Sequence, residues 1–183
     1  FAELFRDKDG KTLSKKDMES INLYMQHRHN IDCIRNGRLF MDCDEKVSSD
    51  YIRLIETQNP WVRDMATDIK SWYGAFMQEW AVGSGLMSKF TYDFLQNYYP
   101  NYVPGFRVDK KGIRSILQNN GRGEEYHIGS ATKRAEGSTK EIMHIQESYM
   151  QVVESIVKKA RKNEMVLGMF DSAAKHPDMF ATF

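Results

Sequence analysis

The segment QHRHNIDC (residues 26–33) comes closer than any other stretch of the chain to a metal-binding pattern. If it is helical, His29 and Cys33 lie one turn apart on a shared face, and imidazole and thiolate are ligands that zinc accepts. Only these two ligands are present locally, and no second pair follows at a matching spacing. We therefore expect no metal and no other cofactor, and a histidine that packs within a helix and hydrogen-bonds to its surroundings.

Other catalytic patterns are absent from the sequence. There is no G-x-S-x-G motif, and Cys33 and Cys43 have no helix-start or glycine context that would lower a thiol pKa. The glycine-rich GSATKRAEGS matches neither a phosphate-binding loop nor a dinucleotide fingerprint, and Asp7-x-Asp9-Gly10 does not continue as a calcium loop. We expect no catalytic residue in the chain. A fragment of an enzyme whose catalytic residues lie outside it is an alternative.

Two basic groups are candidates for binding phosphate or nucleic acid. They are Lys133 and Arg134 in a loop, and Lys158, Lys159, Arg161 and Lys162 near the end of an expected helix. The second group complements a helix dipole, which is a sufficient structural reason for it. If both groups fold onto one side they form a phosphate site, whose affinity would fall steeply with salt. The net charge of +1 does not by itself indicate nucleic acid or a membrane.

The connector NYYPNYVPGFR (residues 97–107) carries unusual aromatic surface and one arginine. Proline stiffens this segment, so ordering Arg107 costs less entropy than ordering an arginine on a free loop. Its guanidinium can lock the connector to backbone carbonyls or a carboxylate, or it can anchor an acidic partner. We favour the lock, because buried loop backbone needs hydrogen-bond partners. We call Tyr102, Pro104, Phe106 and Arg107 the clasp, and expect it to join the front and rear helices.

The elements that position these residues are expected to be helices. With 183 residues, 4 prolines and 11 methionines, the chain suits a single helical domain, or an excised module of a longer polypeptide. We predict a mainly α protein, an irregular bundle of four to five helices, with an irregular or small β-hairpin insert at residues 100–137. The helices are expected near residues 14–35, 49–56, 60–82, 88–98 and 138–163.

The helix at 60–82 is expected to be the centre of the core. Its apolar residues recur at spacings of three and four and include all three tryptophans, and Asn59-Pro60 favours a helix start. The last helix should begin at Ser138, where Glu141 completes a capping box, and break at Asn163. Strand-like residues near 126–128 suggest the hairpin. No apolar run approaches the roughly eighteen residues that span a bilayer, so we expect no membrane partner.

Three segments resemble one protein family when they are taken together. They are INLYMQHRHNID, SGLMSKFTYDFLQNYYPNYVPGFR and KRAEGSTKEI, followed by a helix that reaches ARKN. This order is similar to a domain of the very large polyvalent proteins of tailed bacteriophages, which carry a Y-V-P-L-x-R-F-G signature. The residues in matching places are Tyr102, Val103, Pro104 and Arg107. Gly105 stands where the family has leucine, and Val108-Asp109 where it has an aromatic residue and glycine.

The resemblance implies a non-catalytic structural or interaction module of a large phage or prophage polyvalent protein. Such proteins are carried in the particle or delivered with the genome, so the expected location is the virion or the host bacterial cytoplasm. The expected partners are other domains of the same polypeptide or phage proteins. A module that contacts nucleic acid through the basic groups is the alternative.

Overall fold

The structure is a computed structural model that describes residues 5, 6, 10, 12–106 and 142–176. Its elements in chain order are α1 (Lys15–Arg35), α2 (Glu45–Gln58), α3 (Val62–Phe76), the π-helix η2 (Met77–Val82), α4 (Lys89–Tyr98) and α6 (Ile145–Lys175). Within these ranges no strand is present, and Arg6 and Thr12 form an isolated antiparallel bridge. The prediction of a mainly α fold is confirmed. The hairpin predicted near 126–128, and the insert beyond residue 106, lie outside the described residues.

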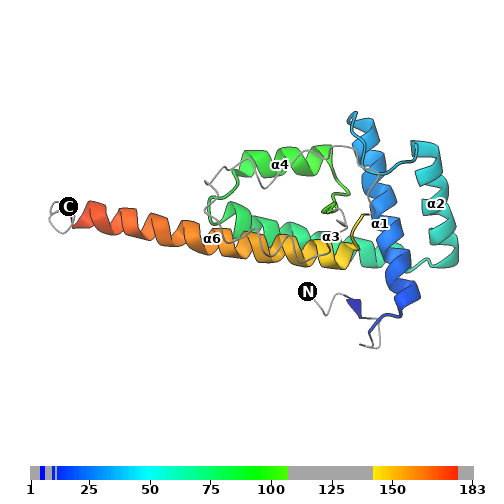
Figure 1. Cartoon of the computed structure of the whole chain (residues 1–183), viewed down its shortest axis with the longest axis horizontal. Helices are drawn as coiled ribbons and strands as arrows, with labels where there is room; N and C mark the ends of the chain where they lie inside the picture. The colour runs from blue at the N-terminus through cyan, green and yellow to red at the C-terminus, as the bar shows by residue number, and fades with distance from the viewer. Residues whose placement is uncertain (1–4, 7–9, 11, 107–141, 177–183) are drawn as a thin grey trace, which may run out of the picture.

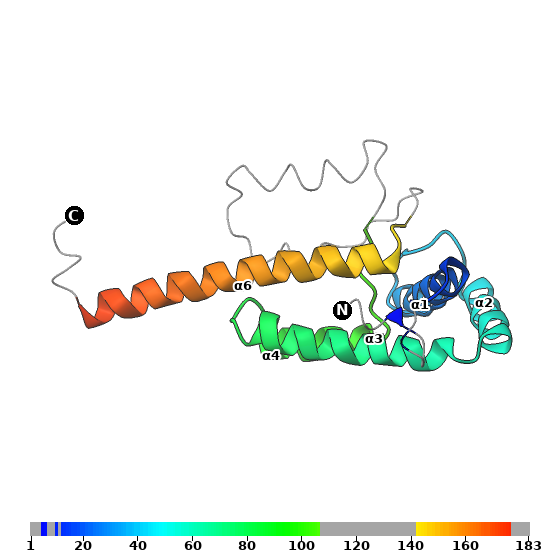
Figure 2. The same cartoon turned by 90° about the horizontal axis from the view of Figure 1, so that it is seen from below.

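The helices form a short bundle from which one helix projects (Figure 1). η2 continues α3 directly, and the two together run beside α6 along the long axis. α4 folds back along α3. α1 crosses the end of this layer, with α2 on its outer side (Figure 2). The C-terminal end of α6 lies at the opposite end of the molecule from α1 and α2. The hairpin of helices predicted at residues 60–98 is therefore present.

Side-chain caps mark the starts of α1, α4 and α2. Ser14 accepts from the Asp17 amide (3.2 Å) and Ser88 from the Thr91 amide (3.0 Å), so both helices begin next to the predicted starts at residues 14 and 88. α2 begins four residues before the predicted Ser49, because the Asp44 carboxylate accepts from the Val47 amide (2.7 Å) and starts the helix there.

The buried face of α3 lies within the predicted apolar stripe, but the tryptophans are not at its centre. Its fully covered residues are Val62, Ala66, Ile69, Tyr73 and Phe76, whereas Trp61, Trp72 and Trp80 are only partly buried and pack at the edge of the core. α3 packs closely against α6, with the Tyr73 and Tyr149 ring centroids 4.9 Å apart. The buried face of α3 therefore holds side chains smaller than tryptophan. The helix begins at Val62, and Asn59 makes no side-chain cap. The side-chain nitrogen of Asn59 instead donates to Ser20 Oγ (3.4 Å).

Two predictions for α6 need correction. Residues 142–144 are not helical, and the helix begins at Ile145, whose amide donates to Asn22 Oδ1 on α1 (3.0 Å). The predicted start at Ser138 lies outside the described residues. Asn163 does not break the helix: its side-chain amide donates to the carbonyl of Ser84, in the turn after η2, and the helix continues to Lys175. Among the helices described here, none is both long and apolar enough to cross a membrane.

Candidate functional site

The connector after α4 is held between α1 and α6 through its backbone. Asp32 on α1 accepts from both nitrogens of Asn101, at 2.6 Å from the backbone amide and 3.1 Å from the side chain. On the other side, the Tyr149 hydroxyl of α6 donates to the carbonyl of Tyr102 (3.1 Å). The connector therefore ties the front helix to the rear helix. This is the arrangement expected of the clasp, although side chains of α1 and α6 supply these bonds.

Three members of the clasp lie within the described residues. Pro104 is fully buried, Phe106 is partly buried, and the carbonyl of Phe106 accepts from the Met143 amide (2.8 Å). Tyr102 is 38% exposed over the whole residue, but its ring lies 6.0 Å from that of Tyr73, and burial raises the pKa of its hydroxyl to about 12. We therefore regard its ring as part of the packed connector. Arg107 lies outside the described residues.

The glycine that departs from the phage signature has a steric reason in this structure. A Cβ atom on Gly105 would collide with the ring of Phe40, which is buried beside it. Phe40 also packs edge-on against His29, at 4.5 Å between ring centroids. A leucine at position 105 would therefore displace an aromatic contact of α1.

His29 and Cys33 form a buried packing pair. Cys33 Sγ lies 3.5 Å from His29 Nε2, and rings of Phe40, Tyr99 and Tyr102 surround the imidazole. Burial lowers the pKa of His29 to about 4 and, with a smaller contribution from the Asp32 charge, raises the pKa of the Cys33 thiol to about 12. The hydrogen bond predicted for this histidine is made at Nε2, with Cys33, whereas Nδ1 has no hydrogen-bond partner among the described residues. In the part of the chain that the structure describes, no three metal-binding side chains gather.

The predicted phosphate-binding groups are only partly placed. Lys133 and Arg134 lie outside the described residues. Lys158, Lys159, Arg161 and Lys162 lie in the middle of α6, because the helix continues to Lys175. The helix-dipole reason given for them from the sequence is therefore wrong, since the dipole acts only within the last turn. Lys158 forms an ion pair with Glu154 one turn earlier.

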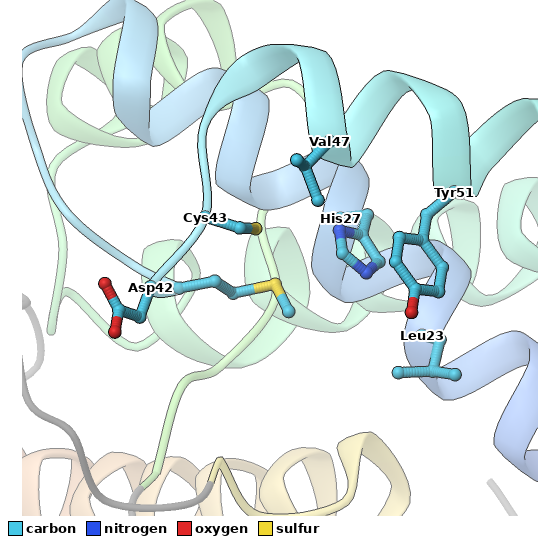
Figure 3. A pocket seen from close by; sticks show the side chains of 7 residues that line it. Leu23, His27, Asp42, Cys43, Val47 and Tyr51 are labelled. Carbon is cyan, nitrogen blue, oxygen red and sulfur yellow. The ribbon is translucent and has the colours of Figure 1, made fainter.

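A pocket between α1 and α2 was not predicted. It has a volume of about 280 Å³ and lies between the two helices and the loop that joins them (Figure 3). Its lining residues are Leu23, His27, Met41, Asp42, Cys43, Val47 and Tyr51. The His27 ring stacks on the Tyr51 ring at 4.6 Å with an interplanar angle of 9°, so one wall of the pocket is aromatic. The spacing of Val47, Tyr51 and Leu54 in the sequence was the available signal.

The Ser48 hydroxyl is the centre of a buried polar network beside this pocket. Asn30 Nδ2 donates to Ser48 Oγ (2.9 Å), and His27 Nδ1 and Cys43 Sγ lie 3.2 and 3.4 Å from the same oxygen. Asn30 Oδ1 accepts from the Met41 amide (2.8 Å). Burial lowers the pKa of His27, which favours the neutral form of the ring. The network fixes the loop against α1 and holds the pocket open.

The two halves of α6 have the same apolar pattern and different surroundings. In residues 145–160, the proximal half, one face packs into the core; its buried apolar residues are Ile145, Tyr149, Ile156 and Ala160. After Ala160, the residues that follow on the same face of the helix at spacings of three and four are Asn163, Leu167, Phe170 and Ala174. In residues 161–175, the distal half, the apolar side chains are exposed. We call Val166, Leu167, Met169 and Phe170 the distal stripe.

The distal stripe was missed because the sequence interpretation ended the helix at Asn163. The signal was the apolar run from Met165 to Phe170 directly after that residue. Comparisons of this chain with family models, with curated proteins and with solved structures find no match.

Proposed function

We propose that this chain is a non-catalytic structural or interaction module, and that the distal stripe is its binding face. The observation that carries the proposal is the exposure of the stripe, from 42% at Val166 to 69% at Phe170. Large apolar side chains gathered on one surface mark sites of interaction, whereas single exposed ones are ordinary. Because Leu167 and Phe170 continue the face that packs in the core, a second apolar helix or groove can cover them in the same way.

The energetics favour a partner over an uncovered helix. Covering an apolar side chain of this size contributes roughly 1.5 to 3 kcal/mol. The distal half extends about 20 Å beyond the bundle at 1.5 Å per residue. After Asn163, whose side chain bonds to Ser84, its described side chains are exposed except for the partly buried Ala173. An isolated helix of this length is marginal in water. A partner would therefore order the distal half as it binds.

Site-specific photo-crosslinking in cells that produce the protein tests the binding face. A photoreactive phenylalanine analogue at position 170 should give one discrete adduct, identified by mass spectrometry. The matched control is position 90 on α4, where Phe90 is 80% exposed outside the stripe. If position 170 gives no adduct beyond that seen at position 90, the stripe is not a binding face.

We further propose that the module belongs to a large phage or prophage polyvalent protein, present in the virion or in the host bacterial cytoplasm. The support is the resemblance in element order and at Tyr102, Val103 and Pro104, together with the hydrogen bond by which the Tyr149 hydroxyl holds the carbonyl of Tyr102. Its partners would then be other domains of the same polypeptide or phage proteins. Sequencing the surrounding reading frame tests this placement. Enzymatic domains in the same frame would support it, and stop codons close to both ends would contradict it.

A second candidate function is contact with nucleic acid. The observation in its favour is the set of four cations within about one turn and a half of α6. Retention on DNA should then fall steeply as salt rises, and charge reversal of all four residues should abolish it. Equal retention of the reversed and the natural protein would rule this function out. Within the described ranges, nothing adds support to an enzyme fragment.

A further inference from the structure

We propose that the occupant of the distal stripe is a second copy of this chain, and that the stripe of one copy docks into the groove between α1 and α2 of the next. This inference rests on the proposed function, because it names the partner of the same binding face. We call the pocket of Figure 3 and the exposed side of α2 beside it the α1–α2 groove.

The groove is apolar and uncovered. On α2, Val47, Tyr51 and Leu54 are 41, 44 and 50% exposed and recur at spacings of four and three, so they form one stripe. Leu23 of α1 lines the opposite wall. α2 therefore buries one face against its own chain, including Ser48 and Ile55, and leaves a second apolar face open. Helices pack by inserting ridges of side chains into such grooves.

The size and shape of the pocket suit a side chain of the stripe. A volume of about 280 Å³ is small for a drug-sized ligand and large enough for an aromatic ring. The Tyr51 ring stacks on His27 and is 44% exposed, so it offers open aromatic surface against which the ring of Phe170 can pack. Phe170 is the largest and most exposed side chain of the stripe.

The charges of the two surfaces are complementary. Residues 42–56, which border the groove, contain five carboxylates and two cations. Residues 158–175, which carry the stripe, contain five cations and two carboxylates. Such complementarity steers two surfaces together and fixes their register. The pairing should weaken as salt rises, because exposed charges are screened.

The same charges disfavour the simplest alternative, an antiparallel pairing of two distal halves. That arrangement, with Leu167 of one copy opposite Phe170 of the other, would bring Glu164 of each copy close to Asp171 of its neighbour. Like charges brought together at an interface are unfavourable. Docking into the groove also brings Glu164 and Asp171 near an acidic border, but there the four cations at residues 158–162 give the approaching stretch a net positive charge against a net negative one.

The positions of the two surfaces determine the kind of assembly. The distal half and the α1–α2 pair lie at opposite ends of the molecule (Figures 1 and 2). An interface that joins unlike surfaces at opposite ends leaves one free stripe and one free groove after each addition. Association should therefore continue beyond the dimer, to open chains or closed rings.

The first experiment measures the molar mass of the purified protein by light scattering and sedimentation. Over roughly 1 to 300 μM, a range suited to a small interface, the average mass should rise past that of a dimer. Phe170→Glu in the stripe and Tyr51→Lys in the groove should each weaken association by about tenfold or more. Phe90→Glu on α4 is the matched control and should associate like the natural protein. All three positions are exposed, and circular dichroism checks that each variant is folded.

The second experiment mixes the two defective variants. The natural stripe of the Tyr51→Lys protein can still dock into the natural groove of the Phe170→Glu protein. We therefore expect a one-to-one complex that grows no further, although each variant alone is monomeric. No complex in the mixture would overturn the proposal. A natural protein that stops at a dimer insensitive to Tyr51→Lys would also overturn it, in favour of pairing between two stripes.

These results also separate this inference from the proposed function. If the natural protein stays monomeric at every concentration while position 170 still crosslinks to a different polypeptide in cells, the second copy is excluded and the binding face stands. If position 170 gives no specific adduct and the protein is monomeric, both proposals fail.

Discussion

The proximal and distal halves of α6 have the same apolar periodicity, yet only one of them is covered. In the proximal half, Tyr149 is fully buried and reaches the connector with its hydroxyl. In the distal half, Phe170 occupies an equivalent place in the pattern and is 69% exposed. Periodicity therefore predicts that a face will be buried, but it does not say by what. Here the first half of the face stabilises the fold, and the second half is available to a partner.

The largest expected difference between the halves concerns their aromatic residues. Tyr149→Ala removes a fully buried ring and leaves the Tyr102 carbonyl without its donor, so the free energy of unfolding should fall by about 3 to 5 kcal/mol. Phe170→Ala in dilute protein should change it by no more than about 0.5 kcal/mol, because the side chain is exposed. Urea unfolding monitored by circular dichroism measures both values. Equal losses would show that the stripe packs against its own chain.

A second difference concerns pH, because the clasp end of the molecule holds a buried imidazole. The pKa of His29 is about 4 in the folded protein and about 6.5 in the unfolded chain, so the unfolded chain binds the proton first. The stability contributed by neutral His29 is complete above pH 6.5 and is lost as pH falls toward 4, by up to about 3 kcal/mol.

The measurement is the urea midpoint between pH 4 and 7, compared with His29→Gln, which cannot titrate. The natural protein should lose more stability than the variant over this range. Parallel curves for the two proteins would mean that His29 is not held in its neutral form.

A smaller difference concerns two glycines. Gly105→Ala places a methyl group against the Phe40 ring, so the free energy of unfolding should fall by about 1 to 3 kcal/mol. Gly168→Ala in the distal half should leave it unchanged or raise it by up to about 1 kcal/mol, because no atom lies within 4 Å of the added methyl group and alanine favours a helix. Thermal unfolding of both variants tests the pair. If Gly168→Ala lowered the free energy of unfolding, the distal half would be packed against another part of the protein, which would contradict this prediction.

The sequence was sufficient for features that depend on neighbouring residues. The helix starts at Ser14 and Ser88, and the mainly helical fold of the described residues, follow from local patterns. The end of α6 was predicted wrongly because Asn163 is a weak helix former. Its side chain instead bonds to the Ser84 carbonyl, 79 residues earlier in the chain, and no local rule reveals that contact.

The candidate sites divide in the same way. Stiff proline and aromatic residues identified the connector, but the residues that hold it, Asp32 and Tyr149, lie 69 and 47 positions away from the groups they bind. The pocket depends on how α1 meets α2, so its residues share no local motif. The distal stripe could have been found, since its spacing was present in the sequence.

Backbone amide hydrogen exchange along α6 tests the central claim most directly. In dilute protein, amides of the proximal half should exchange slowly and those of the distal half near the rate of an unprotected chain, because no tertiary contact stabilises them. In concentrated protein the distal amides should become protected while the proximal ones do not change. Distal amides as protected as the proximal ones in dilute solution would contradict the division of α6 into a covered and an open half.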